Sequence, residues 1–496
     1  IERMSKSIKL NAFYKSVLSV LNIIFPLVTA PYVARVLSVG GFTEYNKAIS
    51  IIGWFSPFAV FGVYTYGMRT VSQIKNDKKK VSALFTKLFT FNIFTSALVT
   101  AAYVIMVLLV PAFLKYRNIY LILASQIFFV CFATDYVNEA FENYGFILVK
   151  TFLCRFLYVI SVFVFVRKSD DIFIYVFLAS LSLILNNIFT FFYAKSKIKF
   201  SRICFKDLTS LFKPLSVVFL LVNSSMLYTI FDRFMLVWFS DALSLTYYNV
   251  SQTIILAVVN VTTSVLLVSI PRLSFYWAED KRNEYYSLLE KSSSSFMALH
   301  TPCCIGMAAL SFEVFYIYAG QKYLSGALSL CLFSVRYYFS AFDMILAKQV
   351  LLATGNEKIL TKIYYCAGVY NILCKIVLVL LNKLTPGLCI VTTASSDILV
   401  VFLQILFIRK LGFNFSIFSK KNFKYLTTSF LFIPIVLAIK QFVSFDGAVS
   451  ILIRSVLSVV LCALLYLSML IFTKDEFLKN LAFWKSKKQV IGAENE

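Results

Sequence analysis

The chain has 496 residues, of which 60% are apolar and only 15% are charged. Ordinary soluble domains are about 45–50% apolar and about 25% charged, so this composition excludes soluble enzymes, DNA-binding modules and disordered scaffolds and indicates a membrane protein. The 48 lysines and arginines exceed the 24 acidic residues and give a net charge of +24. No basic patch stands apart from the apolar runs as a nucleic-acid-binding face would, so the positive charge needs a membrane explanation and we expect no nucleic-acid partner.

Apolar runs long enough to cross a bilayer recur along the whole chain. A helix needs about 20 apolar residues to span the hydrocarbon layer. No cleavable signal pattern precedes the first run, which we expect to remain in the membrane. The runs predict an all-α protein with fourteen transmembrane helices at residues 16–37, 48–66, 84–110, 118–138, 146–166, 172–194, 214–238, 243–271, 294–319, 326–353, 363–381, 386–408, 425–443 and 448–472.

The basic residues of the connecting segments divide unevenly between the two sides of the membrane. With the N-terminus inside, the cytoplasmic segments hold 31 lysines and arginines and the external segments hold 8. Short cytoplasmic loops are enriched in Lys and Arg, so both termini are predicted to be cytoplasmic. The cytoplasmic segments are 1–15, 67–83, 139–145, 195–213, 272–293, 354–362, 409–424 and 473–496.

The sequence lacks the signals of enzymatic or metal chemistry. The ten cysteines show no spacing of a disulfide framework or a zinc site, and the one histidine, His300, lies near a predicted helix start. There is no Walker-type phosphate loop, and no connection is long enough to form a catalytic domain. We therefore expect a transporter without enzyme activity, cofactor or metal.

Short matches indicate an internal repeat with an offset of 203 residues. Tyr45 precedes Arg69 by 24 residues, and Tyr248 precedes Arg272 by the same distance. Because six spans separate the copies, both begin on the same side of the membrane, as in parallel transporter repeats. The predicted domains are a six-helix lobe at 1–194, a second six-helix lobe at 207–408, two additional helices at 425–472 and a basic tail at 473–496.

Nine basic residues lie within the predicted spans, where an ionisable group is costly unless it is paired or faces water. Those near span ends are interpreted as snorkelling to the headgroups; these are Lys87, Lys150, Lys348 and Arg454. The other five are candidate ligand-binding cations: Arg35, Arg155, Arg233, Arg336 and Lys375.

Ion pairing within the membrane is an equal alternative for two of these cations. Arg336 shares a helix face with Asp343, and Lys375 is expected to reach Asp397 on the next span. Arg35, Arg155 and Arg233 have no obvious local acid, because Asp232 points away from its neighbour on a helix. Spare positive charge suits an anionic ligand, and guanidinium groups match diphosphate well.

Acidic residues within the spans are candidates for ion coupling. Asp135, Glu139 and Glu142 fall at i, i+4 and i+7 toward the cytoplasmic end of the fourth span. Like charges held together raise one another's pKa, so this face can carry a coupling proton or cation; a solvated helix end is the favoured alternative. The further candidates are Asp232, Asp343 and Asp397.

The chain resembles the O-antigen and capsular repeat-unit flippases of the multidrug/oligosaccharidyl-lipid/polysaccharide exporter superfamily. The best segments are PLVTAPYVARVL at 26–37 and YGMR at 66–69, followed by Asp232-Arg233, PRLS at 271–274 and QVLLATGNEK at 349–358. Their order extends over nearly the whole chain. The chain departs from the family at 37–43 and 241–244, where more glycines are usual, and this puts the geometry of those loops in question.

The resemblance implies a two-lobed bundle in a bacterial plasma membrane that alternates between inward and outward openings. The implied cargo is an undecaprenyl-diphosphate-linked oligosaccharide, and the implied partners are membrane lipids and the polysaccharide polymerase with its chain-length machinery. Arg35 and Arg233 match family positions, so they are expected to attract the headgroup in a cationic central cavity. The alternatives are a cation-coupled multidrug exporter, expected to have an acid-lined lobe, and a lipid II flippase of the same superfamily.

Overall fold

The computed structural model describes residues 2–202, 204–223, 230–413, 415–417, 419–443 and 447–478, and all regular structure within these ranges is helical. Backbone N–H and C=O groups find no water in the hydrocarbon layer, so a spanning segment must satisfy them internally. The all-α expectation is confirmed. The chain divides into two compact units, one up to Thr246 and the other from Tyr247 onward.

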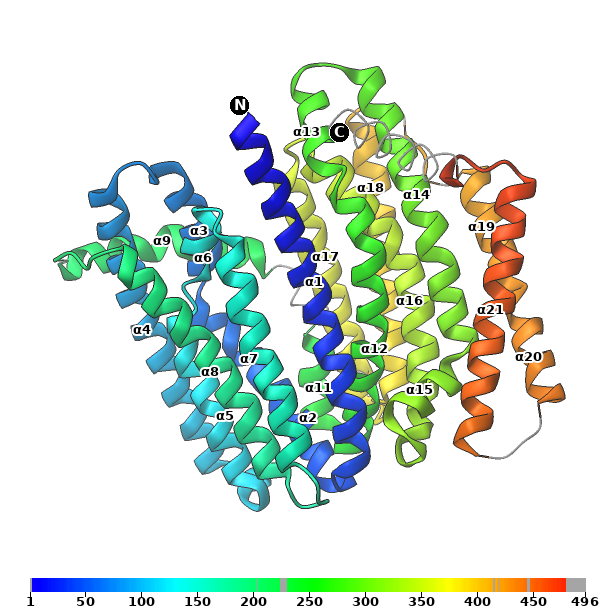
Figure 1. Cartoon of the computed structure of the whole chain (residues 1–496), viewed down its shortest axis with the longest axis horizontal. Helices are drawn as coiled ribbons and strands as arrows, with labels where there is room; N and C mark the ends of the chain where they lie inside the picture. Colours follow the sequence, from blue (N-terminus) through cyan, green and yellow to red (C-terminus); the bar gives the residue numbers. More distant parts are fainter. Residues whose placement is uncertain are drawn as a thin grey trace, which may run out of the picture. The chain divides into compact units, whose positions relative to one another are not determined.

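The first unit is built mainly from long helices that pack side by side. In Figure 1, α4, α5, α7 and α8 run along one another, and α9 lies across the ends of α3 and α4. Helix α11 packs against α2. The bounds are α1 (Glu2–Val36), α2 (Val39–Val60), α3 (Val63–Ile74), α4 (Lys78–Leu109), α5 (Arg117–Phe129), α6 (Asp135–Ala140), α7 (Tyr144–Phe165), α8 (Ile172–Lys197), α9 (Phe205–Val222) and α11 (Phe231–Phe239).

The second unit has a central helix, α16, that packs against α14 and α18, while α17 packs against α18. The last two helices of the described chain, α20 and α21, pack against each other and against α14 and α15. The bounds are α12 (Ala242–Leu267), α13 (Ile270–Ala278), α14 (Arg282–Ala309), α15 (Ser311–Ala319), α16 (Ala327–Ile345), a π-helix (Leu346–Leu352), α17 (Glu357–Leu380), α18 (Pro386–Lys410), α19 (Lys420–Phe430), α20 (Phe432–Phe442) and α21 (Ala448–Phe472).

The number of spans that the described residues contain is close to the predicted fourteen. Twelve helices are long and apolar enough to cross a membrane, and α14 with α15, bent by 76°, makes a thirteenth. The remaining prediction, a span at 214–238, includes residues 224–229, which lie outside the described residues. Its flanks are α9 and α11. The predicted limits of the lobes, the appended helices and the tail stay a prediction.

The same order of elements occurs in both units. A long helix and a short one (α2 and α3; α12 and α13) are followed by a long helix and one 3-10 segment, Pro111–Tyr116 or Gln321–Gly326, with the short α15 added before the 3-10 segment in the second unit. The next span is irregular toward its end in each copy, with a 3-10 break at Val130–Phe132 and a π-helix in the second unit. Each of these spans ends at a residue with positive φ, Glu142 at 57° and Gly355 at 77°.

Close packing fixes the position of α6 in the first unit. A β-carbon added to Gly67 on α3 would lie 2.6 Å from the ring of Tyr136 on α6, and Tyr136 is fully buried. These residues belong to a core that includes Leu88 and Val137. The irregular fourth span is thus held against α3 by a contact that tolerates only glycine.

Candidate functional site

The most deeply buried ion pair joins two helices of the second unit. Arg336 on α16 donates from Nε to Oδ2 of Asp397 on α18 at 2.8 Å, and the two side chains are 3% and 5% exposed. The guanidinium carbon also lies 5.5 Å from the ring centroid of Tyr337. Removing one partner would leave the other charge buried and uncompensated, which destabilises the fold. The pair therefore holds α16 against α18.

The ion-pair alternative considered for Arg336 named the wrong acid. Two residues seven positions apart share a helix face but lie two turns apart along the axis, whereas i, i+4 neighbours can touch. Arg336 therefore does not use Asp343 on its own helix but pairs with Asp397, the acid that was the alternative partner of Lys375.

Asp343 on α16 is held by neutral groups. Its carboxylate accepts a hydrogen bond from Nε2 of Gln404 at 2.6 Å and one from the hydroxyl of Tyr364 at 3.1 Å. No ion pair involves Asp343 within the described ranges. It thus differs from Asp397, whose negative charge is matched by an arginine.

Lys375 on α17 is fully buried and is surrounded by oxygen atoms of α18. Its ammonium group donates to the carbonyl of Cys389 at 2.9 Å, to the hydroxyl of Thr393 at 3.0 Å and to the hydroxyl of Thr392. These oxygens replace much of the water that the charge would otherwise bind. The lysine thereby ties α17 to α18.

The first unit contains a second buried ion pair, which corrects one interpretation of the sequence. Lys150 on α7 lies 2.9 Å from Oδ2 of Asp135 on α6 and also donates to the hydroxyl of Thr190 on α8. The lysine side chain is 3% exposed. It therefore does not snorkel to the headgroups, because an acid at the same depth on a neighbouring helix offers a closer partner.

The three acids of the fourth span do not share one continuous helix face. The span is broken at Val130–Phe132, and α6 ends at Ala140, before Glu142. Each acid has a separate partner: Glu139 accepts from the hydroxyl of Tyr64 at 2.8 Å, and Glu142 lies 3.7 Å from the exposed Lys75. The predicted acidic face is thus divided into three separate contacts.

Arg155 is a predicted cation without an ion-pair partner among the described residues. It lies in the middle of α7, is half-buried, and forms no hydrogen bond or ion pair with the residues that the structure describes. One turn further on, the hydroxyl of Tyr158 interacts with Tyr175 on α8 and with Thr29 on α1. Arg155 therefore lies beside a group of hydroxyls and keeps its donors available for a ligand.

The two cations that the family resemblance singles out lie at helix positions with different exposure. Arg35 is in the last turn of α1 and is exposed, while Arg233 on α11 is half-buried. Both take part in interactions within the structure, as does the buried Asp232.

Sequence reasoning missed the neutral partners, which are Tyr64, Thr190, Tyr364, Thr392, Thr393 and Gln404. Nothing in their spacing distinguishes them from other polar residues in the spans. The sequence does indicate the Arg336–Asp397 pair through the depth of its two members. Arg336 lies 10 residues after the start of its predicted span and Asp397 lies 11 residues after the start of its own, so both lie at nearly the same depth in the membrane.

Twelve or more apolar helices with charged pairs inside them define a multi-pass membrane protein with the polar interior that transporters require. Residues 8–277 match the family described as polysaccharide biosynthesis protein. The chain belongs to this family, which confirms the resemblance to the O-antigen flippases. It is 21% identical over 358 residues to a putative O-antigen transporter of Shigella dysenteriae, covering 71% of this chain and 88% of that protein.

Solved structures share the fold. An inward-closed structure of the lipid II flippase MurJ matches with a TM-score of 0.72 and 15% identity over 94% of this chain and 99% of that one. An inward-facing multidrug resistance MATE family transporter of the MOP superfamily matches with a TM-score of 0.57 and 10% identity over 79% and 96%. At these identities the similarity establishes a common fold.

Proposed function

We propose that this protein carries an oligosaccharide repeat unit, linked to undecaprenyl diphosphate, from the cytoplasmic to the outer leaflet of a bacterial plasma membrane. The product would supply O-antigen or capsular polysaccharide synthesis. The family match over residues 8–277 carries this proposal, and the Shigella relative supports it. A polymerase and its chain-length machinery are the proposed partners that receive the unit.

Arg155 is the residue of this structure that best suits a diphosphate headgroup. Its guanidinium is half-buried at the middle of a span and meets no carboxylate among the described residues. A planar guanidinium presents paired donors to phosphate oxygens. We propose that Arg155 contacts the diphosphate and that Arg35 and Arg233 attract it, while Arg336 and Lys375 hold α16, α17 and α18 together.

Asp343 and Glu139 are the proposed sites of ion coupling. Protonating Asp135 or Asp397 would strand the charge of the buried partner, Lys150 or Arg336. Asp343 and Glu139 accept hydrogen bonds from tyrosine hydroxyls and form no ion pair with described residues. They can gain and lose a proton without uncovering another charge, which suits alternating access driven by a proton gradient.

A second candidate function is translocation of lipid II, which the fold similarity to the lipid II flippase favours. Native mass spectrometry of the purified chain tests both candidates together. The protein is mixed with equal amounts of an undecaprenyl-diphosphate oligosaccharide, lipid II and a cationic dye. Preferential retention of the oligosaccharide lipid supports the proposal, preferential retention of lipid II favours the second candidate, and retention of the dye alone overturns both.

A further inference from the structure

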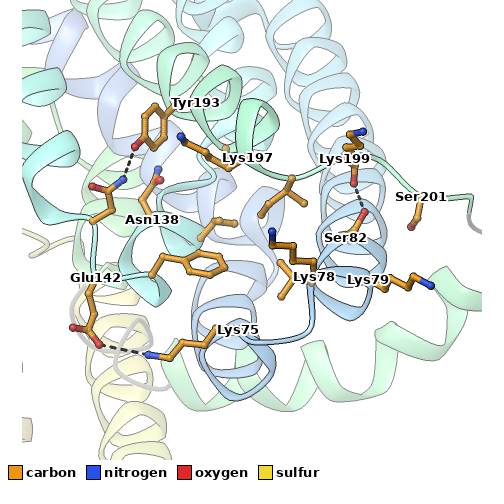
Figure 2. A pocket seen from close by; sticks show the side chains of 16 residues that line it. Lys75, Lys78, Lys79, Ser82, Asn138, Glu142, Tyr193, Lys197, Lys199 and Ser201 are labelled. Atoms are coloured by element: carbon orange, nitrogen blue, oxygen red, sulfur yellow. Dashed lines mark hydrogen bonds and ion pairs between the residues drawn. The ribbon is translucent and has the colours of Figure 1, made fainter.

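A cavity of about 990 Å³ opens at one end of the first unit. Lysines from the α3–α4 connection and from the end of α8 line it, and Asn138 and Glu142 lie on the opposite side; Lys79 extends away from the other lysines (Figure 2). The sequence assigns all three connections, 67–83, 139–145 and 195–213, to the cytoplasmic side. The cavity therefore lies where the spans of this unit meet the predicted cytoplasmic headgroup layer.

The lining carries more positive than negative charge. Lys75 is 3.7 Å from Glu142, the one acid in the lining. No described residue forms an ion pair with the other four lysines of the lining, which are Lys78, Lys79, Lys197 and Lys199. Four uncompensated cations around one cavity create a site that attracts anions.

A buried amide in the lining has a donor without a partner. Asn138 is 3% exposed, and its Nδ2 makes no hydrogen bond with any described residue. The neighbouring Asn143 uses its own Nδ2 to donate to the hydroxyl of Tyr193 at 2.7 Å. The hydroxyl of Ser201, also in the lining, is likewise buried without a partner. Buried polar groups are normally satisfied, so these two groups point to a ligand that bears oxygen atoms.

The same cavity has an apolar side. This side consists of Val81, Val137, Phe141, Ala194 and Ile198. A small soluble anion would leave these side chains in contact with water, whereas a phospholipid offers both a phosphate and a glycerol-acyl region. Anionic lipids are concentrated in cytoplasmic leaflets, and basic pockets between helices on that side suit their headgroups.

We propose that this cavity binds the phosphate headgroup of an anionic phospholipid of the cytoplasmic leaflet. The lysines pair with the phosphate, the amide of Asn138 donates to one of its oxygens, and the apolar side contacts the glycerol-acyl region. Such a lipid would bridge α3, α6 and α8. This inference is independent of the cargo that the protein carries.

Lysine footprinting of the full chain in nanodiscs tests the site. The nanodiscs contain phosphatidylcholine with either none or a fifth of phosphatidylglycerol, and acylation of each lysine is measured by peptide mass spectrometry. We expect phosphatidylglycerol to slow acylation of Lys78, Lys79, Lys197 and Lys199 at least threefold. Acylation of exposed lysines on the same predicted side should change less than twofold; these are Lys358, Lys362, Lys410 and Lys420.

Two variants separate a built site from general surface attraction. Asn138→Leu removes the amide donor with little change in volume and should abolish most of the protection. Replacing the four cavity lysines with glutamine should lower the number of phosphatidylglycerol molecules retained in native mass spectrometry, whereas the same change at the four control lysines should not. These surface positions tolerate substitution, so this comparison remains informative if Asn138→Leu fails to fold.

Two outcomes would overturn the proposal. Equal protection of cavity and control lysines would mean that phosphatidylglycerol acts only through the charge of the bilayer surface. Protection by millimolar pyrophosphate in nanodiscs of pure phosphatidylcholine, without protection by phosphatidylglycerol, would assign the cavity to a soluble anion.

Discussion

Arg336 and Asp397 lie 61 residues apart in the chain, yet their side chains meet 2.8 Å apart in the interior of the second unit. Removing one member should destabilise the protein by about 3–5 kcal/mol, because the other charge is left buried. We therefore expect Arg336→Met to lower the unfolding midpoint in detergent, and Arg336→Met with Asp397→Leu to recover most of the loss. A double variant as unstable as the sum of the single variants would contradict this coupling. Arg167→Met, at an exposed position, serves as the control.

Gly67 should be intolerant of any side chain. An added β-carbon lies 2.6 Å from the buried ring of Tyr136, so Gly67→Ala forces this ring to shift and should cost about 1–3 kcal/mol. The matched control is Gly53→Ala on α2, where an added β-carbon has no atom within 4 Å and alanine favours the helix. Thermal unfolding of the two variants checks the prediction, which fails if both behave alike.

Arg155 should affect translocation and not folding. Its side chain makes no hydrogen bond or ion pair with a described residue, so Arg155→Ala should express and melt like the natural protein. We expect at least a tenfold lower rate of headgroup translocation in proteoliposomes, with Arg155→Lys retaining more activity because it keeps the charge. Unchanged translocation in Arg155→Ala would remove this residue from the cargo path. Arg167→Ala is the matched control.

Asp343 should couple transport to an ion gradient. Asp343→Asn preserves the shape and the hydrogen bonds to Gln404 and Tyr364 but fixes the group in a neutral state. The variant is expected to translocate cargo at the same rate with and without an imposed proton gradient. Glu139→Gln is tested in parallel, and the exposed Asp170→Asn is the control. If all three variants respond to the gradient like the natural protein, neither acid is the coupling site.

A pH-dependent contact follows α21. Burial opposes ionisation of Asp475, but hydrogen bonds from Lys424, from the backbone of Phe477 and from the hydroxyl of Tyr425 outweigh it and lower the pKa of Asp475 below 3.8. A lowered pKa means that the carboxylate stabilises the fold at neutral pH. This stabilisation is lost as the pH falls below 3.8 and through the lowered pKa of the folded protein.

Asp475→Asn should therefore be less stable than the natural protein by about 1–3 kcal/mol at neutral pH. The difference should stay constant between about pH 7 and 5 and shrink below about pH 4, as the carboxyl of the natural protein takes up a proton. Thermal unfolding of both proteins across this range measures the difference. A gap that persists unchanged to pH 3 would mean that the contact does not depend on the charge of Asp475.

The helices, and the charges inside them, were predictable from the sequence, but the partners of those charges were not. Lipid forces each apolar run of about 20 residues into a helix, so the spans follow from composition alone. Partners depend on depth and on which helices touch. Lys375 lies 6 residues from the external end of its predicted span and Asp397 lies 11 from the same side. At about 1.5 Å per residue Lys375 lies nearer the membrane surface than Asp397, whereas Arg336 matches the depth of Asp397.

The neutral hydrogen-bond partners and the basic cavity required the structure. Tyr364 and Gln404 reach Asp343 from two other helices, and no periodicity in the sequence relates these three residues. The cavity lysines lie in segments that the distribution of basic residues assigns to the cytoplasmic side. Their position around one cavity with Asn138 depends on how α3, α4, α6 and α8 pack together.

Translocation of a labelled undecaprenyl-diphosphate oligosaccharide in proteoliposomes tests the central claim most directly. The label on the sugar is quenched from outside, and the fraction protected is followed over time with and without a proton gradient. We predict that liposomes containing the protein equilibrate the headgroup at least tenfold faster than empty liposomes, with a further change when the gradient is imposed. A rate equal to that of empty liposomes, for several oligosaccharide lipids and with folded protein, would contradict the proposed function.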